Sequence, residues 1–182
     1  SQVSLGDMSY QASLSWSTVE RIKSKFNIPL ILKGINRVDD ALRAVDLGVD
    51  VIYVSNHGGR QLDHAVGSLS LLPGIVKAVN NRAEVAVDGG FYRGTDIIKA
   101  IALGANAVGL GRLEGWALAA GGVPALSRCL KILQWEIASA MALCGINSLA
   151  ELDSSFITQT DVVSISDVFS AFPLLNLEDQ GY

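Results

Sequence analysis

The 182-residue sequence contains little cysteine and histidine, the residues that most zinc sites use as ligands. It has two cysteines, Cys129 and Cys144, and two histidines, His57 and His64, whose spacing matches no zinc-binding pattern. We therefore expect no metal site. The sparse cysteines lie in helical-looking sequence, so we expect buried free thiols in a reducing, cytoplasmic compartment. Neither a phosphate-binding P-loop nor the glycine fingerprint of a dinucleotide-binding fold is present.

Excess positive charge and long apolar runs are absent as well. The 14 lysines and arginines are outnumbered by 18 acidic residues, and the net charge of −4 argues against binding of nucleic acid or anionic membranes. No apolar run reaches about 18 residues, so no transmembrane helix is expected. Residues 1–7 resemble neither a signal peptide nor a transit peptide. Hydrophobic residues make up 49% of the chain, which fits one domain whose sheet is buried on both faces.

A strand followed by a helix recurs four times along the chain. Short, β-branched segments without alternation predict buried parallel strands, and their alternation with helices predicts βαβ units. We expect the strands at residues 29–33, 51–55, 84–88 and 107–110. We expect helices at residues 17–26, 38–47, 69–80, 95–104 and 124–143, the first capped by Ser15 or Ser17 and the last carrying an apolar stripe of Leu126, Leu130, Leu133, Ile137 and Met141. Residues 1–13 are interpreted as a loop.

Four such units form either a small open sheet or part of a (β/α)8 barrel, which needs eight strands. All four expected strands end in polar or glycine residues: Lys33, Ser55 with His57, Asp88-Gly89-Gly90, and Gly111-Arg112. In a TIM barrel the strand ends converge on one face, and phosphate is bound after the seventh and eighth strands. We therefore interpret residues 1–152 as the C-terminal half (strands five to eight) of a (β/α)8 TIM barrel, completed by another segment or chain. Residues 153–182 are interpreted as a C-terminal tail.

The turn after the second strand carries a base and a fixed cation. His57 can take a proton near neutral pH, and Arg60 can hold a carboxylate through a two-pronged contact. The pair predicts a site for an anionic substrate that loses a proton, although a structural turn histidine with a surface arginine is the alternative. Lys33 can place positive charge beside a cofactor, or it can be a solvated lysine at a strand end. We interpret His64 as structural.

The last two strand ends predict a phosphate site. Asp88-Gly89-Gly90 leads into a helix whose expected cap is Thr95, and bare amides at such a helix start bind phosphate. Asp88 could hold the hydroxyls of a sugar-like chain. With Gly111 and Arg112, two adjacent strand ends would close on one phosphate; a surface ion pair is the alternative for Arg112. Two tryptophans near the last helix are interpreted as packing residues: Trp116 and Trp135.

With these motifs the sequence resembles the FMN-dependent α-hydroxy-acid oxidases and dehydrogenases, a family that includes glycolate oxidase, lactate oxidase and mandelate dehydrogenase. The run Ser-Asn-His-Gly-Gly-Arg-Gln-Leu-Asp at residues 55–63 is the most specific match. The resemblance covers residues 14–152, and its other matching segments are 15–16, 29–35, 88–90, 93–96, 102–105 and 111–112. It implies oxidation of an L-2-hydroxy acid to a 2-keto acid, with electrons passing to FMN and then to oxygen or another acceptor.

The resemblance also assigns roles to residues. Lys33 would lie beside N1 and O2 of the flavin and stabilise its reduced form, and Ser55 would contact the ring region. His57 would be the catalytic base, and Arg60 would bind the substrate carboxylate. Asp88 would hold the ribityl chain. The phosphate would be surrounded by Gly89, Gly90, Arg93, Gly111 and Arg112.

The chain departs from the family pattern at Tyr92, where the family usually has a phosphate-binding arginine; Arg93 aligns with the next family arginine. Family members also have an N-terminal half that supplies the first four strands. The resemblance therefore implies an N-terminal half-barrel chain as a partner, and we expect a homo-oligomer. Two alternatives stay open: a divergent member acting on a larger or peptide-linked substrate, and a flavin- or phosphate-binding subunit without turnover.

Overall fold

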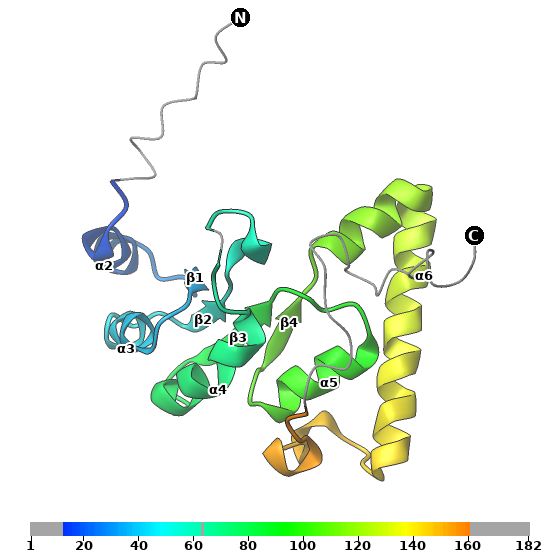
Figure 1. Cartoon of the computed structure of the whole chain (residues 1–182). Coiled ribbons are helices and arrows are strands. Elements are labelled where there is room, and N and C mark those ends of the chain that lie inside the picture. The colour runs from blue at the N-terminus through cyan, green and yellow to red at the C-terminus, as the bar shows by residue number, and fades with distance from the viewer. Residues whose placement is uncertain (1–12, 63, 161–182) are drawn as a thin grey trace, which may run out of the picture.

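The computed structural model describes residues 13–62 and 64–160, which form one parallel sheet with helices along it (Figure 1). The sheet has four strands: β1 (Ile31–Ile35), β2 (Val51–Val54), β3 (Glu84–Asp88) and β4 (Ala107–Gly109). The helices are α2 (Trp16–Lys25), α3 (Val38–Asp46), α4 (Ser68–Val79), α5 (Gly94–Ala102) and α6 (Arg112–Cys144), and short 3₁₀ turns are η1 (His57–Gly59), η2 (Leu149–Glu151) and η3 (Ser154–Phe156). The predicted α/β pattern is confirmed, with the cap of α2 at Ser15. The predictions for residues 1–12 and 161–182 lie outside the described residues.

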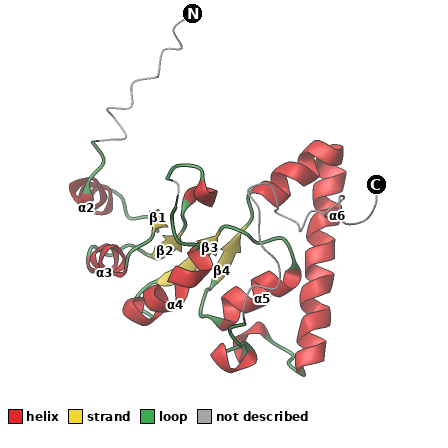
Figure 2. Cartoon of the chain, viewed as in Figure 1, coloured by secondary structure: helices red, strands yellow, loops and turns green. Residues whose placement is uncertain are grey.

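The strands pair in the order of the chain, β1-β2-β3-β4, and every pair is parallel. An open doubly wound sheet reverses its strand order at a switch point, whereas a barrel keeps consecutive strands adjacent. Figure 2 shows α3, α4 and α5 along one side of the sheet, with α6 beyond them next to α5. This order is the one that a TIM barrel requires of successive strands.

The core lies between the sheet and the helices. Ile52 and Val54 of β2 and Val87 of β3 are fully buried there, against Leu72 and Ile75 of α4. The opposite face of the sheet is less covered than the composition predicts, because Ile31 is 57% exposed and the side chain of Lys33 is 42% exposed. The expectation of a sheet buried on both faces holds for β3, where Val85, Ala86 and Val87 are all buried, but is wrong for β1. That face is instead where polar side chains gather.

Helix α6 consists of two helical segments joined at a glycine pair. Gly121 and Gly122 leave helical geometry, and Gly122 has φ +62°. The segment after the break matches the predicted helix at 124–143. The segment before it, residues 112–120, was not predicted from the sequence. It begins directly after β4, so its N-terminus lies at the carboxyl end of the sheet (Figure 1).

Three expectations about α6 need correction. Cys144 is exposed and Cys129 is half-buried, so the prediction of buried thiols is wrong. Trp135 is 71% exposed, and Leu130 of the expected apolar stripe is 43% exposed. The physical reason is that α6 packs mainly on α5, which buries only the side of the helix that carries Leu133. Ile137 and Met141 of the predicted stripe are partly buried against the cluster formed by Ile98 and Ala102, so the stripe is confirmed in part.

Candidate active site

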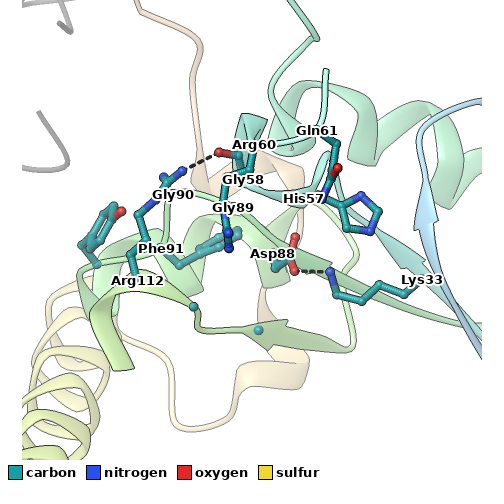
Figure 3. A pocket seen from close by; sticks show the side chains of 13 residues that line it. Lys33, His57, Gly58, Arg60, Gln61, Asp88, Gly89, Gly90, Phe91 and Arg112 are labelled. Atoms are coloured by element: carbon teal, nitrogen blue, oxygen red, sulfur yellow. Dashed lines mark hydrogen bonds and ion pairs between the residues drawn. The ribbon is translucent and has the colours of Figure 1, made fainter. Parts of the chain in front are cut away.

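A cavity of about 430 Å³ lies at the carboxyl ends of the strands. The predicted site residues that line it are Lys33, His57, Arg60, Asp88, Gly89, Gly90, Gly111 and Arg112. They come from four strand ends, which are far apart in the sequence and meet only in the folded chain (Figure 3). Residues that sequence reasoning did not assign also line it: Gly58, Gln61, Phe91, Tyr92 and Gly109. Ser55 and Arg93 are not among the lining residues.

Lys33 is held at the floor of the cavity by three neighbours. Its ammonium group lies 2.8 Å from Asp88 Oδ2 and donates to Ser55 Oγ at 2.9 Å. The ammonium also lies 4.9 Å from the centre of the Tyr53 ring, in a cation–π contact. Ser55 is fully buried beneath it. Ser55 therefore acts on the cavity through Lys33, and the alternative of a freely solvated lysine is not supported.

Asp88 presents one satisfied and one unsatisfied carboxylate oxygen. Oδ2 carries the ion pair with Lys33, whereas Oδ1 is buried and has no hydrogen-bond partner among the described residues. A buried acceptor without a donor is unfavourable, so this oxygen is suited to accept from a ligand hydroxyl.

Tyr53 and Gly109 form a tight pair next to this cluster. A Cβ built on Gly109 would lie almost on top of the Tyr53 hydroxyl, so any side chain at this position would force the Tyr53 ring to move. Burial, and then the negative charge of Asp88, raise the pKa of Tyr53. The phenol is therefore neutral at physiological pH and offers a hydroxyl rather than a charge. The contact between the two residues was not predicted from the sequence, because they lie on different strands, far apart along the chain.

The turn η1 carries His57 in a strained backbone conformation, with φ +56°. Two side chains that precede His57 fix the turn through hydrogen bonds to its backbone amides. Ser55 Oγ accepts from His57 N at 3.1 Å, and Asn56 Oδ1 accepts from Gly58 N at 3.0 Å. A non-glycine residue keeps such a conformation only when its surroundings hold it, which is common at functional sites.

Arg112 connects this turn to the far end of the cavity. Its guanidinium donates to the carbonyl of Gly58, as Figure 3 shows. The alternative of a surface ion pair is not what the structure has, because the partner is a backbone carbonyl. The remaining N–H groups of the guanidinium have no partner within residues 13–62 and 64–160, so they can bind an anion in the cavity.

The structure places the open helix start after β4, not after β3. The amides of Tyr92 and Arg93 donate to Asp96 Oδ2, at 3.1 and 3.0 Å, so the start of α5 is already capped by this chain. The expected cap, Thr95, is wrong. The start of α6, at Gly111, has no side-chain cap and lies on the cavity. A phosphate at the end of β4 and a short following helix is the arrangement found in TIM barrels.

Arg93 points away from the cavity and binds Glu136 of α6. Its Nε donates to Glu136 Oε1 at 2.7 Å, and the Gly94 amide donates to Glu136 Oε2 at 2.6 Å. This contact spans 43 residues, so sequence reasoning could not foresee it. The place of Arg93 beside the cavity is taken by Tyr92, whose ring stacks on Trp116 at 5.6 Å.

The Arg93 contact predicts acid sensitivity of the fold. The Arg93 side chain, and then the Gly94 amide, lower the pKa of Glu136 from its ordinary value of 4.5. Because the folded-state pKa is depressed, Glu136 stabilises the fold above its unfolded pKa, and this contribution is lost as the pH falls through the folded pKa. We expect Glu136→Gln to lower the urea midpoint at pH 7 and to bring the midpoints of variant and parent together at pH 3. The exposed Glu20→Gln is the control; equal pH profiles for Glu136→Gln and the parent would contradict the prediction.

No set of three histidine, cysteine, aspartate or glutamate residues suited to a metal ion occurs in residues 13–62 and 64–160. No helix in the same ranges is long and apolar enough to cross a bilayer.

A parallel sheet in barrel order, with a histidine, an arginine and glycine-rich turns at its carboxyl ends, fits an α/β protein of the TIM-barrel class. The family model for FMN-dependent dehydrogenase matches residues 1–159, and the chain belongs to this family. FMN is the cofactor of this family, and two of the relatives are an L-lactate oxidase and a 4-hydroxymandelate oxidase.

The sequence is similar to an L-lactate oxidase from Nostoc sp., with 54% identity over 145 residues, or 80% of this chain and 40% of the relative. It is 49% identical over 138 residues to a 4-hydroxymandelate oxidase from Amycolatopsis orientalis, covering 76% of this chain and 39% of that protein. Among solved structures, mandelate oxidase with (S)-2-phenylpropionate superposes with a TM-score of 0.73 at 48% identity, covering 75% of this chain and 41% of that one. The chain thus spans about 40% of the length of these relatives.

Proposed function

We propose that this chain carries the FMN-binding and proton-abstracting side of an enzyme that oxidises an L-2-hydroxy acid to a 2-keto acid. The observation that carries the proposal is the convergence of His57, Arg60, Lys33, Asp88 and Arg112 on one cavity. When bound there, FMN would accept the two electrons that the hydroxy acid loses. Oxygen or another acceptor would then reoxidise it.

The substrate end of the cavity is the η1 turn. Arg60 would hold the carboxylate of the hydroxy acid through charge-assisted hydrogen bonds. His57, three residues earlier on the same turn, would take the proton from the substrate. Both side chains line the cavity together with Lys33, whose positive charge would favour negative charge on a cofactor beside it.

The cofactor end fits FMN in two respects. Asp88 Oδ1 is the buried acceptor without a partner, and a ribityl hydroxyl would satisfy it. A Cβ built on Gly90 or Gly111 would meet nothing within 4 Å, so a group of the size of a phosphate can approach the backbone there. Arg112 and the uncapped start of α6 would supply positive charge and amide donors. Arg93 is left out of this proposal because Glu136 holds it.

We further infer that these strands are the fifth to eighth of a barrel that another segment or chain completes. The helix-free face of the sheet and the exposed apolar side chains Ile31 and Trp135 support this inference, since such surfaces are usually covered. The homo-oligomer, the cytoplasmic location and the tail at 153–182 stay predictions. Purification of this chain alone is the test: a stable, yellow, catalytically active monomer would contradict the need for a partner segment.

The phosphate role of Arg112 can be measured with two flavins. We expect Arg112→Ala to weaken FMN binding roughly 10- to 100-fold, the effect of losing one or two charge-assisted hydrogen bonds. Riboflavin lacks the phosphate, so its affinity should stay the same. Flavin fluorescence quenching measures both, and Arg37→Ala, which changes an exposed arginine outside the cavity, is the control. An equal loss for FMN and riboflavin would mean that Arg112 does not bind the phosphate.

A further inference from the structure

Gly34 occupies a bulge in strand β1, next to Lys33. In the pairing with β2, Lys33 lies opposite Tyr53 and Ile35 lies opposite Val54, so Gly34 is the extra residue. Its φ is +96°, a conformation that glycine adopts without strain. The bulge turns the backbone of β1 toward the neighbouring strand end, where His57 stands.

The imidazole of His57 rests on this glycine. A Cβ built on Gly34 would lie 2.9 Å from His57 Cε1, and 3.6 and 3.8 Å from the two ring nitrogens. Carbon atoms in ordinary contact are about 3.5 to 4.0 Å apart. Any side chain at position 34 would therefore displace the ring.

The His57 backbone offers little room to retreat. Its amide is bound to Ser55, and the carbonyl of the next residue, Gly58, is bound by Arg112. The imidazole itself makes no hydrogen bond or ion pair within the described residues. Figure 3 shows the His57 ring at the cavity wall near Lys33. Packing, including the contact with Gly34, thus sets the orientation of the ring.

We propose that Gly34 is a positioning residue for the His57 imidazole. Because Gly34 has no Cβ, the Cε1 edge of the ring lies against the bulge, and the ring stands over the cavity beside Lys33. The effect of Gly34 on catalysis rests on the proposed role of His57 as the base. If His57 is the base, moving its ring by about 1 Å can slow the reaction about 100-fold. The placement itself is independent of flavin and substrate.

Proton NMR of the 182-residue chain tests the placement, because the sequence has only two histidines and the His57→Ala variant assigns their signals. We expect a nuclear Overhauser contact between the His57 Cε1 proton and the Gly34 Cα protons. In Gly34→Ala the His57 signal should shift while the His64 signal stays in place. Gly48→Ala is the matched control: Gly48 also has positive φ, +75°, but its added Cβ would meet only Lys23 Cε at an ordinary 3.6 Å. An unshifted His57 signal in Gly34→Ala would overturn the proposal.

Urea unfolding keeps the proposal testable if Gly34→Ala folds poorly. We expect Gly34→Ala to lower the midpoint more than Gly48→Ala does, and this excess to shrink when both are placed in a His57→Ala background. An excess of unchanged size without the imidazole would show that bulge strain alone is responsible and would overturn the proposal. Failure of the chain to support flavin reduction once it is assembled with the segment that completes its barrel would instead contradict the proposed function and leave the contact unaffected.

Discussion

Replacing His57 with alanine will slow the reduction of bound flavin by a 2-hydroxy acid about 10²- to 10⁴-fold, the usual contribution of a general base. The reason is that His57 is the basic side chain on the turn that also carries Arg60, and both line the cavity. Flavin affinity should stay unchanged, because the proposed phosphate contacts come from the ends of β3 and β4. Anaerobic bleaching of the flavin absorbance on mixing with substrate measures the rate.

The other histidine supplies the control for this experiment. His64→Ala should leave the bleaching rate unchanged, since His64 is not among the residues that line the cavity. If His57→Ala still bleaches at the parent rate, then His57 is not the base. If it loses the flavin altogether, the turn contributes to cofactor binding and the two roles must be reassigned.

Replacing Gly94 with alanine will destabilise the fold by about 3 kcal/mol, at the upper end of what overpacking usually does. An added Cβ would lie 2.5 Å from Glu136 Cβ, 2.7 Å from the Ile137 amide nitrogen and 2.9 Å from the Leu133 carbonyl oxygen. Two of these are backbone atoms of α6, so the helix as a whole would have to move away from α5. Urea unfolding followed by circular dichroism gives the free energy of unfolding.

Gly115→Ala is the matched control for this substitution. Gly115 lies inside α6, and a Cβ there would meet nothing within 4 Å. Alanine favours a helix interior over glycine, so we expect Gly115→Ala to be stabilising by about 0.5 to 1 kcal/mol. A Gly94→Ala variant as stable as the parent would show that α5 and α6 can separate without loss.

The strand ends were predictable from sequence because local chemistry marks them. An apolar run that stops at Lys33, His57 or Asp88 combines a buried strand with a polar end, and both signals lie within a few residues. Because adjacent parallel strands end at the same edge of a sheet, their pairing places these polar residues next to one another. The cavity and most of its lining residues followed from this reasoning.

The orientation of the Arg93 side chain was not predictable, because it is set by the carboxylate of Glu136, 43 residues further along the chain. The local pattern of a glycine turn before a helix suggested an open amide cluster, but Asp96 and Glu136 occupy those donors. The same limit applies to Cys144 and Trp135, whose exposure depends on which elements α6 packs against. Sequence periodicity predicts that a helix has an apolar side, but not whether a neighbour covers it.

The contact between Tyr53 and Gly109 restricts how this sequence can change over evolutionary time. A Cβ at position 109 and the phenol ring of Tyr53 would occupy the same space, so the residues at these two positions cannot both be large. A side chain at position 109 fits in place only after a smaller residue has replaced Tyr53, and the reverse order forces the Tyr53 ring out of its present position. In an alignment of relatives, we therefore expect side chains at position 109 only where position 53 is small.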